Sequence, residues 1–466
     1  MFPDQKTEVR CLGTIGKVGW MNESSDSASR VLERQVLEQM SDISAEAQRR
    51  GRGLVDDPYP AWAEAQRQAA VHSGSAVDFF GLSRDEHFIH SRPHVTLLSF
   101  DACDEALNNN LVFSSEIWDE HRSSLRFGRS ILNMVGTEHQ QYRKVVQPAF
   151  TRTKVESWWR PAWIDQVVAE LIDELAGQDT VDLNSTLCVK LPMHVITRAF
   201  GLDDAKAAEF RQQLLINMNP SLDAALLDAA EAHINATLQA EIVARRDDPG
   251  DDLISVMLHG ELKTEDGAEA RLPEELIYGF CRVILTAGGG TTSRQLGITL
   301  VGLLSNPEQF EAVKADRSLI ERAIMESLRW NPTLPFMYRL VTEDVRVQGF
   351  DIPAGSIANI CMGAANRDPA RWDDPHRFDL FRPMKRHLGF MGGPHTCLGM
   401  FVAIAEMRVA INALLDAFPK LRFDPDSGPA RIVGSPDLRG LDHLRVRLDS
   451  PGRGRAATGQ CRSRQG

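Results

Sequence analysis

The spacing of apolar residues predicts a chain built mainly of helices. From about Glu138 to Phe418, apolar positions recur at helical spacing in long runs that prolines divide. Shorter helices are predicted at Ser29–Arg49 and Pro58–Ala70, whereas the segment from His87 to Phe100 has the pattern of a strand. We therefore expect a mainly α fold with a small β region.

Two segments depart from the helical pattern. Residues Asp344–Met362 are predicted to form paired strands around Pro353 and Gly355. Between Asn366 and Leu388 the chain is rich in Pro, Asp and Arg and has little periodicity, and loops of this length are usually functional or disordered. Three parts are predicted along the chain: a disordered N-terminal extension at 1–28, one domain at 29–450 and a disordered basic tail at 451–466.

Composition narrows the class of protein. The 466 residues include 52 basic and 64 acidic side chains, and the net charge of −12 argues against nucleic acid as the main partner. No apolar stretch reaches the roughly 18 uncharged residues of a membrane span. The seven cysteines are scattered without a Cys-x-x-Cys pair, which fits neither a disulfide scaffold nor a zinc module. We expect a cytoplasmic protein whose translation starts at Met1 or Met21.

One short loop carries the strongest chemical signal. The run Phe390–Gly399 holds Cys397 among glycines, which allow the backbone to approach a sulfur atom closely. Exposed N–H groups and the start of the following helix stabilise a thiolate. This arrangement favours a haem-thiolate iron ligand, with Phe390 beside it and His395 as a donor to a haem propionate. The alternative is a buried structural cysteine in a glycine-rich turn.

A second signal lies at the centre of the long helix predicted over Pro273–Asn306, in the run Ala287-Gly288-Gly289-Gly290-Thr291-Thr292. Glycine inside a helix costs about 1 kcal/mol relative to alanine, so three in a row require a compensating gain. Close packing against a crossing helix is one explanation. The other is a groove for dioxygen over the iron, in which the Thr291 hydroxyl is a hydrogen-bond partner and a link in proton delivery.

Five further residues are candidate donors or ion-pair partners. Glu326 and Arg329, three residues apart in a helical segment, share a face and can pair. His139 and Arg143 share another helical face, and Arg339 follows a short apolar run. Any one of these could equally be a solvated surface side chain. Together, however, the donors suit a haem, which carries two carboxylates.

In their order and separation, these four elements resemble the cytochrome P-450 family of haem-thiolate monooxygenases, from about residue 50 to 448. The matching motifs are the Cys397 loop, Glu326-x-x-Arg329, the Ala-Gly-x-x-Thr-Thr centre at 287–292, and His139-x-x-x-Arg143. The resemblance implies a mainly α, triangular single domain that encloses haem b, with Cys397 as the axial thiolate. It also implies that Arg377 joins the Glu326–Arg329 network.

The resemblance assigns further residues to the site. Around the haem it places Cys397 and a set of neighbouring positions: His139, Arg143, Ala287, Gly288, Arg339, Phe390, His395 and Gly399. In oxygen activation it places Gly290, Thr291 and Thr292. In substrate binding it places Ile131, Leu285, Phe336, Met337 and Leu438. Most of these last positions are apolar, which indicates a lipophilic ligand such as a terpenoid, a steroid or a fatty-acid-like compound.

The chain departs from the family pattern at Gly290, where the family usually carries Asp or Glu. That carboxylate is thought to relay protons, so ordered water or a substrate group would take its place here. Peroxide-driven members place Arg and Pro at this helix centre, and this sequence does not. Oxygen-dependent monooxygenation is therefore favoured, with peroxide use as an alternative.

No flavin or nicotinamide fingerprint and no cysteine cluster accompanies the haem region, so electrons would come from a ferredoxin-type iron–sulfur protein and its NAD(P)H reductase. A predicted basic patch suits that acidic partner. Its members are Arg143, Lys144, Arg382, Lys385 and Arg386. We expect a monomer without a membrane anchor.

Two other functions stay open on sequence grounds. A haem protein without turnover, such as a gas or redox sensor, is compatible with Gly290. A non-haem metal protein would use His87, His90 and His94, although Pro93 breaks any single-face helical arrangement of these ligands.

Overall fold

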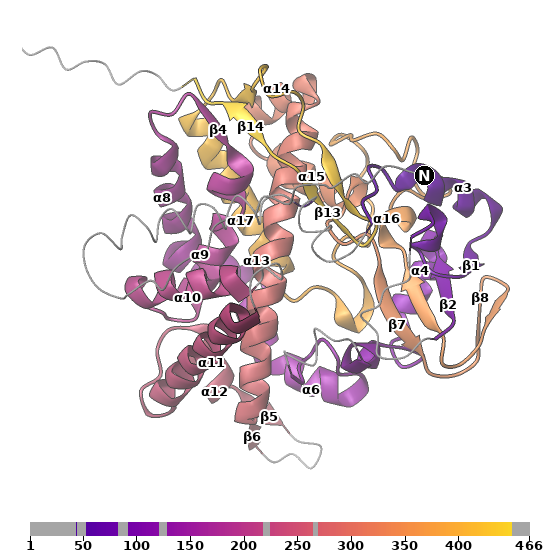
Figure 1. The fold of residues 1–466 in the computed structure, drawn as a ribbon, viewed down its shortest axis with the longest axis horizontal. Coiled ribbons are helices and arrows are strands. Elements are labelled where there is room, and N and C mark those ends of the chain that lie inside the picture. Colours follow the sequence, from indigo (N-terminus) through magenta and orange to yellow (C-terminus); the bar gives the residue numbers. More distant parts are fainter. Residues whose placement is uncertain are drawn as a thin grey trace, which may run out of the picture.

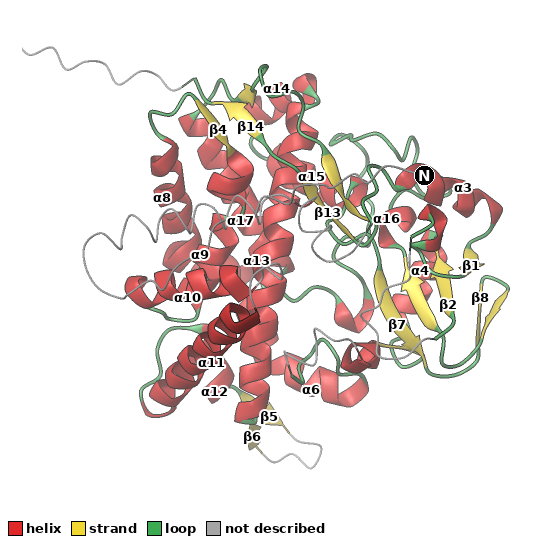
Figure 2. Ribbon diagram, viewed as in Figure 1, coloured by secondary structure: helices red, strands yellow, loops and turns green. Residues whose placement is uncertain are grey.

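The computed structural model describes residue 43 and residues 53–82, 92–120, 128–217, 224–263 and 269–449. Helices gather on one side of the molecule and most strands on the other (Figure 2). The predicted extension at 1–28 and tail at 451–466 lie outside the described residues. So does the helix predicted at Ser29–Arg49, except that Ile43 is helical and 2% exposed.

The helical side is organised around α13 (Glu274–Leu304), whose 31 residues run through the molecule (Figure 1). This confirms the helix predicted over Pro273–Asn306. Glu274 and Glu275 lie in its first turn, where acidic side chains interact favourably with the helix dipole. The other helices of this side are α8 (Asp165–Leu175), α9 (Lys190–Ala199), α10 (Asp204–Asn217), α11 (Ala224–Asp247), α12 (Leu253–His259), α14 (Pro307–Ala315), α15 (Leu319–Trp330) and α17 (Met400–Ala417).

The strand side contains a five-stranded sheet with the order β1-β2-β10-β7-β3. Its strands are β1 (Val71–Ser73), β2 (His94–Leu97), β10 (Ile357–Ile360), β7 (Met337–Val341) and β3 (Phe113–Ser114). The β2–β10 pair is parallel and the other pairs are antiparallel. Ala358 of β10 lies opposite Arg339 of β7, so the sheet fixes the position of that arginine.

The remaining strands form small separate sheets. They are β4 (Thr180–Asp182), β5 (Glu261–Lys263), β6 (Glu269–Arg271), β8 (Val345–Val347), β9 (Phe350–Ile352), β11 (Arg422–Phe423), β12 (Ile432–Ser435), β13 (Leu438–Leu441) and β14 (Arg445–Arg447). The strands predicted within Asp344–Met362 form, but their pairing differs from the prediction. β8 pairs with β9, whereas β10 joins the larger sheet, where buried strands flank it on both sides.

The remaining helices are short. They are α3 (Tyr59–Gln68), α4 (Phe100–Asn108), α6 (Gly136–Val146), α7 (Arg152–Lys154) and α16 (Met362–Ala365), together with the π-helical segments Val155–Ile164 and Asn184–Cys188. The helix predicted at Pro58–Ala70 is confirmed as α3, and Ser99 caps α4 by accepting a hydrogen bond from the Ala102 N–H. The largest buried apolar cluster fills the helical side, and two others pack on the sheet and on α3.

Candidate functional site

The Cys397 loop lies between the irregular segment that ends at Leu388 and the start of α17. The Cys397 N–H donates to the Phe390 carbonyl at 3.0 Å and closes the loop. Gly393 has φ of +62°, and a Cβ there would collide with the Leu107 carbonyl oxygen of α4. Glycine is thus required at 393, whereas a Cβ at Gly399 would meet only open space.

The sulfur of Cys397 combines exposure with electrostatic support. The other described free cysteines, Cys103, Cys188, Cys281 and Cys361, are buried, whereas Cys397 is exposed. The protein around it is deep enough for burial to raise the pKa of the thiol. Hydrogen bonds from the backbone at Gly399 and Met400 and the charge of Arg143 act in the opposite direction. Cys397 is therefore the exposed cysteine among the described ones, and backbone donors and Arg143 are placed to stabilise its thiolate.

Next to this loop, the donors predicted from sequence come together. The His139 and His395 rings stack with centroids 4.1 Å apart. Arg143 donates to the Thr396 carbonyl at 2.6 Å, and Arg339 is buried on β7. Sequence analysis had not singled out Ser115 as a site residue, but its hydroxyl lies 3.2 Å from His395 Nε2. No signal in the sequence links residues 280 positions apart.

This cluster carries the positive charge of Arg143 and Arg339, and no carboxylate of the described residues forms an ion pair with either of them. Burial, helped by the neighbouring Arg339 and Arg143, lowers the pKa of His139 to about 4 and that of His395 to about 2. Burial also lowers the pKa of Arg339 to about 10. Both ring nitrogens of His139 are buried without a hydrogen-bond partner among the described residues. Buried donors in this condition fit a group with two carboxylates, so the site fits a haem.

The three consecutive glycines of α13, Gly288 to Gly290, have three different surroundings. A Cβ at Gly289 would lie 2.8 Å from the Met193 sulfur of α9, which is the close helix packing considered from sequence. A Cβ at Gly288 would meet open space, and Ala287 is exposed although it lies in the middle of a long helix. The Thr291 hydroxyl donates to the Ala287 carbonyl at 2.7 Å, and Thr292 is buried. Close packing thus accounts for Gly289, and the open space at Gly288 leaves room for the predicted groove.

Gly290 faces an arginine that sequence analysis missed. A Cβ at this position would lie 2.7 Å from Arg294 Nη1, so the guanidinium occupies the space into which a side chain at 290 would project. The stem of Arg294 passes Gly440 of β13, where a Cβ would lie 3.2 Å from both Cγ and Cδ. The i,i+4 spacing was the one available signal, because it places residues 290 and 294 on one face of the helix.

The Glu326–Arg329 pair is buried and pins the irregular segment. Arg329 Nε and Nη2 donate to the two oxygens of Glu326, each at 2.8 Å, and the arginine is 1% exposed. Its remaining donors reach the carbonyls of Asn366, Pro375 and Arg377. Arg377 therefore joins through its backbone, while its side chain is exposed. The second guanidinium beside Glu326 is that of Arg382, with Nε 3.5 Å from Glu326 Oε1.

The predicted substrate residues differ in how deeply they are buried. Ile131, Leu285 and Leu438 are buried in apolar clusters, and Met337 is only half-buried. Phe336 is 2% exposed and packs against the rings of Trp62 and Tyr338, in the apolar cluster beside α3.

The sites proposed for other functions can also be located. His94 lies in β2, with Nδ1 3.2 Å from the Asn359 amide, whereas His87 and His90 lie outside the described residues. Among the residues that the model describes, no group of three His, Cys, Asp or Glu side chains is placed to hold a metal ion. In the same residues, no helix is both long and apolar enough to cross a bilayer.

Comparison with known proteins places the chain in a family. A family model described as Cytochrome P450 matches residues 193–439, more than half of the 466 residues. Cytochrome P450 monooxygenase PikC of Streptomyces venezuelae is 31% identical over 405 residues, covering 85% of this chain and 92% of its own. 6-Deoxyerythronolide B hydroxylase of Saccharopolyspora erythraea is 35% identical over 314 residues, covering 67% and 76%.

A solved structure agrees with the sequence relatives. CYP109E1 from Bacillus megaterium, in complex with testosterone, superposes with a TM-score of 0.71 at 26% identity, over 84% of this chain and 99% of its own. The exposed cysteine, the counter-ion-free donors and the fold together define a haem-thiolate protein. The chain belongs to the cytochrome P450 family of bacterial type, whose members are monooxygenases that use a haem-thiolate cofactor.

Proposed function

We propose that the protein uses haem b to insert one oxygen atom from O2 into a lipophilic small molecule, by hydroxylation or epoxidation. The observation that carries the proposal is the exposed Cys397 beside four donors without a counter-ion: His139, Arg143, Arg339 and His395. When bound, the haem supplies the activation of dioxygen, which protein side chains cannot perform.

The chain's own residues have separate tasks in this proposal. Cys397 would ligate the iron as a thiolate, and the backbone donors at Gly399 and Met400 would hold its negative charge. The cluster of His139, Arg143, Arg339 and His395, called the His139–Arg339 cluster, would bind the two haem propionates. The Thr291 hydroxyl donates to the Ala287 carbonyl. Its oxygen lone pairs therefore remain available to accept a hydrogen bond from a group in the predicted oxygen groove.

The role of Cys397 is tested by its substitution. Cys397→Ala is expected to abolish the ferric Soret spectrum that is typical of a thiolate haem. Cys281→Ala, in a buried cysteine of α13, is the matched control and should keep that spectrum. Equal spectra for the two variants would refute the assignment of the iron ligand.

The substrate class rests on apolar lining and on the relatives. Most of the predicted substrate positions are apolar, one relative is named as a macrolide-type hydroxylase, and a similar solved structure holds testosterone. We propose a terpenoid, a steroid or a fatty-acid-like compound. The test is titration of the ferric protein with pooled members of these classes. A low-to-high-spin shift by one pool would identify the class, and no shift with any pool would reject all three.

Electrons would come from a ferredoxin-type iron–sulfur protein with an NAD(P)H reductase. Of the predicted basic patch, Lys144, Lys385 and Arg386 are exposed, although Arg386 forms an ion pair with Asp104. Arg382 is instead turned toward Glu326. An exposed positive charge at Lys144 and Lys385 suits an acidic partner.

The docking surface is tested by charge reversal. Lys385→Glu is expected to lower the rate of haem reduction by the ferredoxin and to weaken its salt dependence. Lys420→Glu, at an exposed lysine beyond the end of α17, is the matched control. If both variants change the rate equally, the patch is not the docking surface.

One observation favours a second candidate, the use of peroxide in place of O2 and a reductase. Sequence analysis found no arginine at the helix centre, but the Arg294 guanidinium reaches Gly290. Product formation with hydrogen peroxide alone is the test. Turnover that is faster with peroxide than with the redox partners, and that Arg294→Asn removes, would establish this function.

A further inference from the structure

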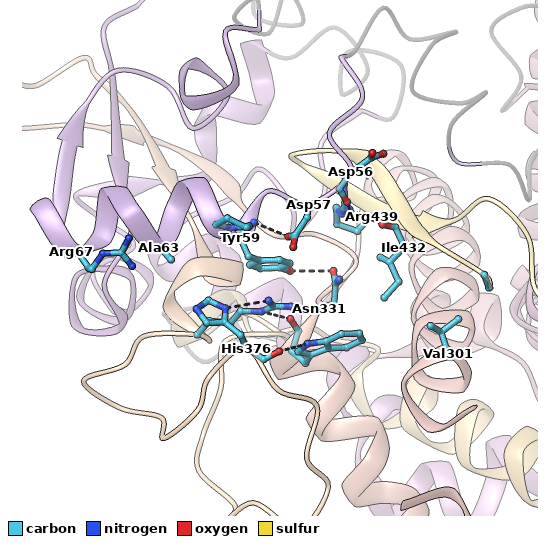
Figure 3. A pocket seen from close by; sticks show the side chains of 14 residues that line it. Asp56, Asp57, Tyr59, Ala63, Arg67, Val301, Asn331, His376, Ile432 and Arg439 are labelled. Carbon is cyan, nitrogen blue, oxygen red and sulfur yellow. Dashed lines mark hydrogen bonds between the residues drawn. The ribbon is translucent and has the colours of Figure 1, made fainter. Parts of the chain in front are cut away.

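A second cavity lies apart from the Cys397 site. It has a volume of about 650 Å³ and opens where α3, the end of α15 and the β12–β13 hairpin meet (Figure 3). None of its lining residues belongs to the Cys397 loop, the His139–Arg339 cluster or the glycine run of α13. A volume of this size suits a small organic ligand. The proposed haem site therefore does not explain why this cavity is present.

Part of the wall is cationic and lacks counter-ions. Arg367 and Arg439 are 6% and 1% exposed. Arg367 Nε donates to the Trp330 carbonyl at 2.6 Å, and Arg439 Nη2 donates to the Ile432 carbonyl at 2.9 Å. In the described residues no carboxylate lies within 4 Å of either guanidinium, and Arg439 Nε has no partner. The partners of both guanidinium groups are neutral, namely carbonyls and, for Arg367, the His376 ring, and a buried cation with neutral partners attracts an anion.

Another part of the wall is acidic. Asp56 and Asp57 are exposed at the rim, and Figure 3 shows them at the end of the cavity away from His376. Asp57 Oδ1 accepts from the Tyr59 N–H at 3.0 Å, and the Asp56 side chain makes no hydrogen bond to the described part of the chain. Arg367 lies at the His376 end, with its Nη1 3.5 Å from His376 Nδ1. Arg439, whose Nη2 donates to the Asp56 carbonyl, lies at the acidic end, so Arg367 alone of these two arginines offers its positive charge at the opposite end.

Aromatic and apolar groups fill the space between the charges. The Trp330 ring is half-buried and packs edge-on against Phe378 at 5.7 Å, while its indole N–H donates to the His376 carbonyl. The side chains of Ile432 and Val301 line the same space (Figure 3). A flat ring can lie against such a surface, because an aromatic face packs well on both aliphatic and aromatic neighbours.

We propose that this cavity is a binding site for an aromatic amino acid or a zwitterion of the same shape. The carboxylate would be held by Arg367, the ammonium group by Asp56 and Asp57, and the ring by Trp330 and Ile432. The site is independent of the proposed monooxygenase reaction, because it shares no residue with the haem site.

The test compares three ligands that differ only in charge. Isothermal titration calorimetry of the full haem-loaded protein would use L-tryptophan, tryptamine, which lacks the carboxylate, and indole-3-propionate, which lacks the ammonium group. L-Tryptophan is expected to bind with one site, and each of the other two about tenfold more weakly or worse, since each loses a charge-assisted contact. Equal affinities of tryptamine and L-tryptophan, or no saturable binding of L-tryptophan, would overturn the proposal.

Substitutions test whether the binding measured by calorimetry takes place in this cavity. Ala63→Phe, on the face of α3 that lines the cavity, should abolish binding, and Gln68→Phe, exposed on the same helix, should not. Asp56→Asn should weaken L-tryptophan about tenfold and leave indole-3-propionate unchanged, with Asp173→Asn on α8 as the matched control.

A competition experiment separates the two sites. An azole that ligates the haem iron should leave the affinity for L-tryptophan unchanged. Loss of binding when the azole is present would place the ligand in the haem site and refute a second site.

Discussion

The contact between Gly290 and Arg294 predicts how this enzyme responds when the missing carboxylate is supplied. In Gly290→Asp, the new Cβ would start 2.7 Å from Arg294 Nη1, so the guanidinium must shift and can then pair with the carboxylate. Replacing glycine inside a helix with aspartate gains a few tenths of a kcal/mol, and the i,i+4 pair adds about 0.3–0.5 kcal/mol. The expected change in stability is therefore below about 1 kcal/mol.

The effect on coupling is expected to depend on Arg294. At about 0.3–0.5 kcal/mol, the pair with Arg294 leaves the carboxylate unpaired roughly a third of the time. Gly290→Asp alone should consequently raise the ratio of product to NADPH consumed only in part. Combined with Arg294→Asn, the same aspartate is released beside Thr291 and should raise that ratio strongly.

The assay is a double-mutant cycle on product formed, peroxide released and NADPH consumed for the wild type, both single variants and the double variant. Thermal unfolding of all four checks that the fold is unchanged. If Gly290→Asp alone reaches the coupling of the double variant, Arg294 does not hold the carboxylate. If neither variant changes coupling, residue 290 has no part in proton delivery in this chain.

Three further substitutions test the loop, the network and a buried acid. Gly393→Ala should lower haem content and thermal stability by more than Gly349→Ala. Both positions have positive φ, which costs alanine about 1 kcal/mol, but only a Cβ at 393 would collide with the backbone. Equal losses in the two variants would show that the loop tolerates the collision. Arg329→Lys should cost about 3 kcal/mol and release haem, measured by thermal unfolding and haem absorbance, since lysine cannot donate to Glu326 and three carbonyls together; wild-type stability would contradict this. Burial raises the pKa of Glu406 from 4.5 to about 8, so the folded state binds this proton more tightly than the unfolded state does. The contribution of Glu406 to stability therefore falls as the pH rises from about 4.5 to about 8. Glu406→Gln should raise the unfolding temperature more at pH 8 than at pH 5, and an equal rise at both pH values would refute the shift.

Local sequence was sufficient for the features that depend on neighbouring residues. The glycines and Cys397 of one loop, and the period of apolar residues in α13 and α3, are set by backbone conformation and by helical spacing. The Glu326–Arg329 pair was likewise predictable, because three residues apart on a helix means one face. That this pair joins a network with Arg377 was expected from the family resemblance, but its partners, the carbonyls of Asn366, Pro375 and Arg377, depend on the fold because they lie more than thirty positions away.

Tertiary packing decided the remaining features of the site. Only the fold could place Arg339 of β7 beside His139 and His395, because that contact depends on which strands pair and not on local spacing. It also moved β10 away from its predicted partner and Phe336 into the core. The sequence by itself determined the chemistry of the cysteine loop, since that depends on residues within one turn of each other. The tertiary structure decided which distant charges meet there without a counter-ion, because burial and desolvation exist only once the chain has packed.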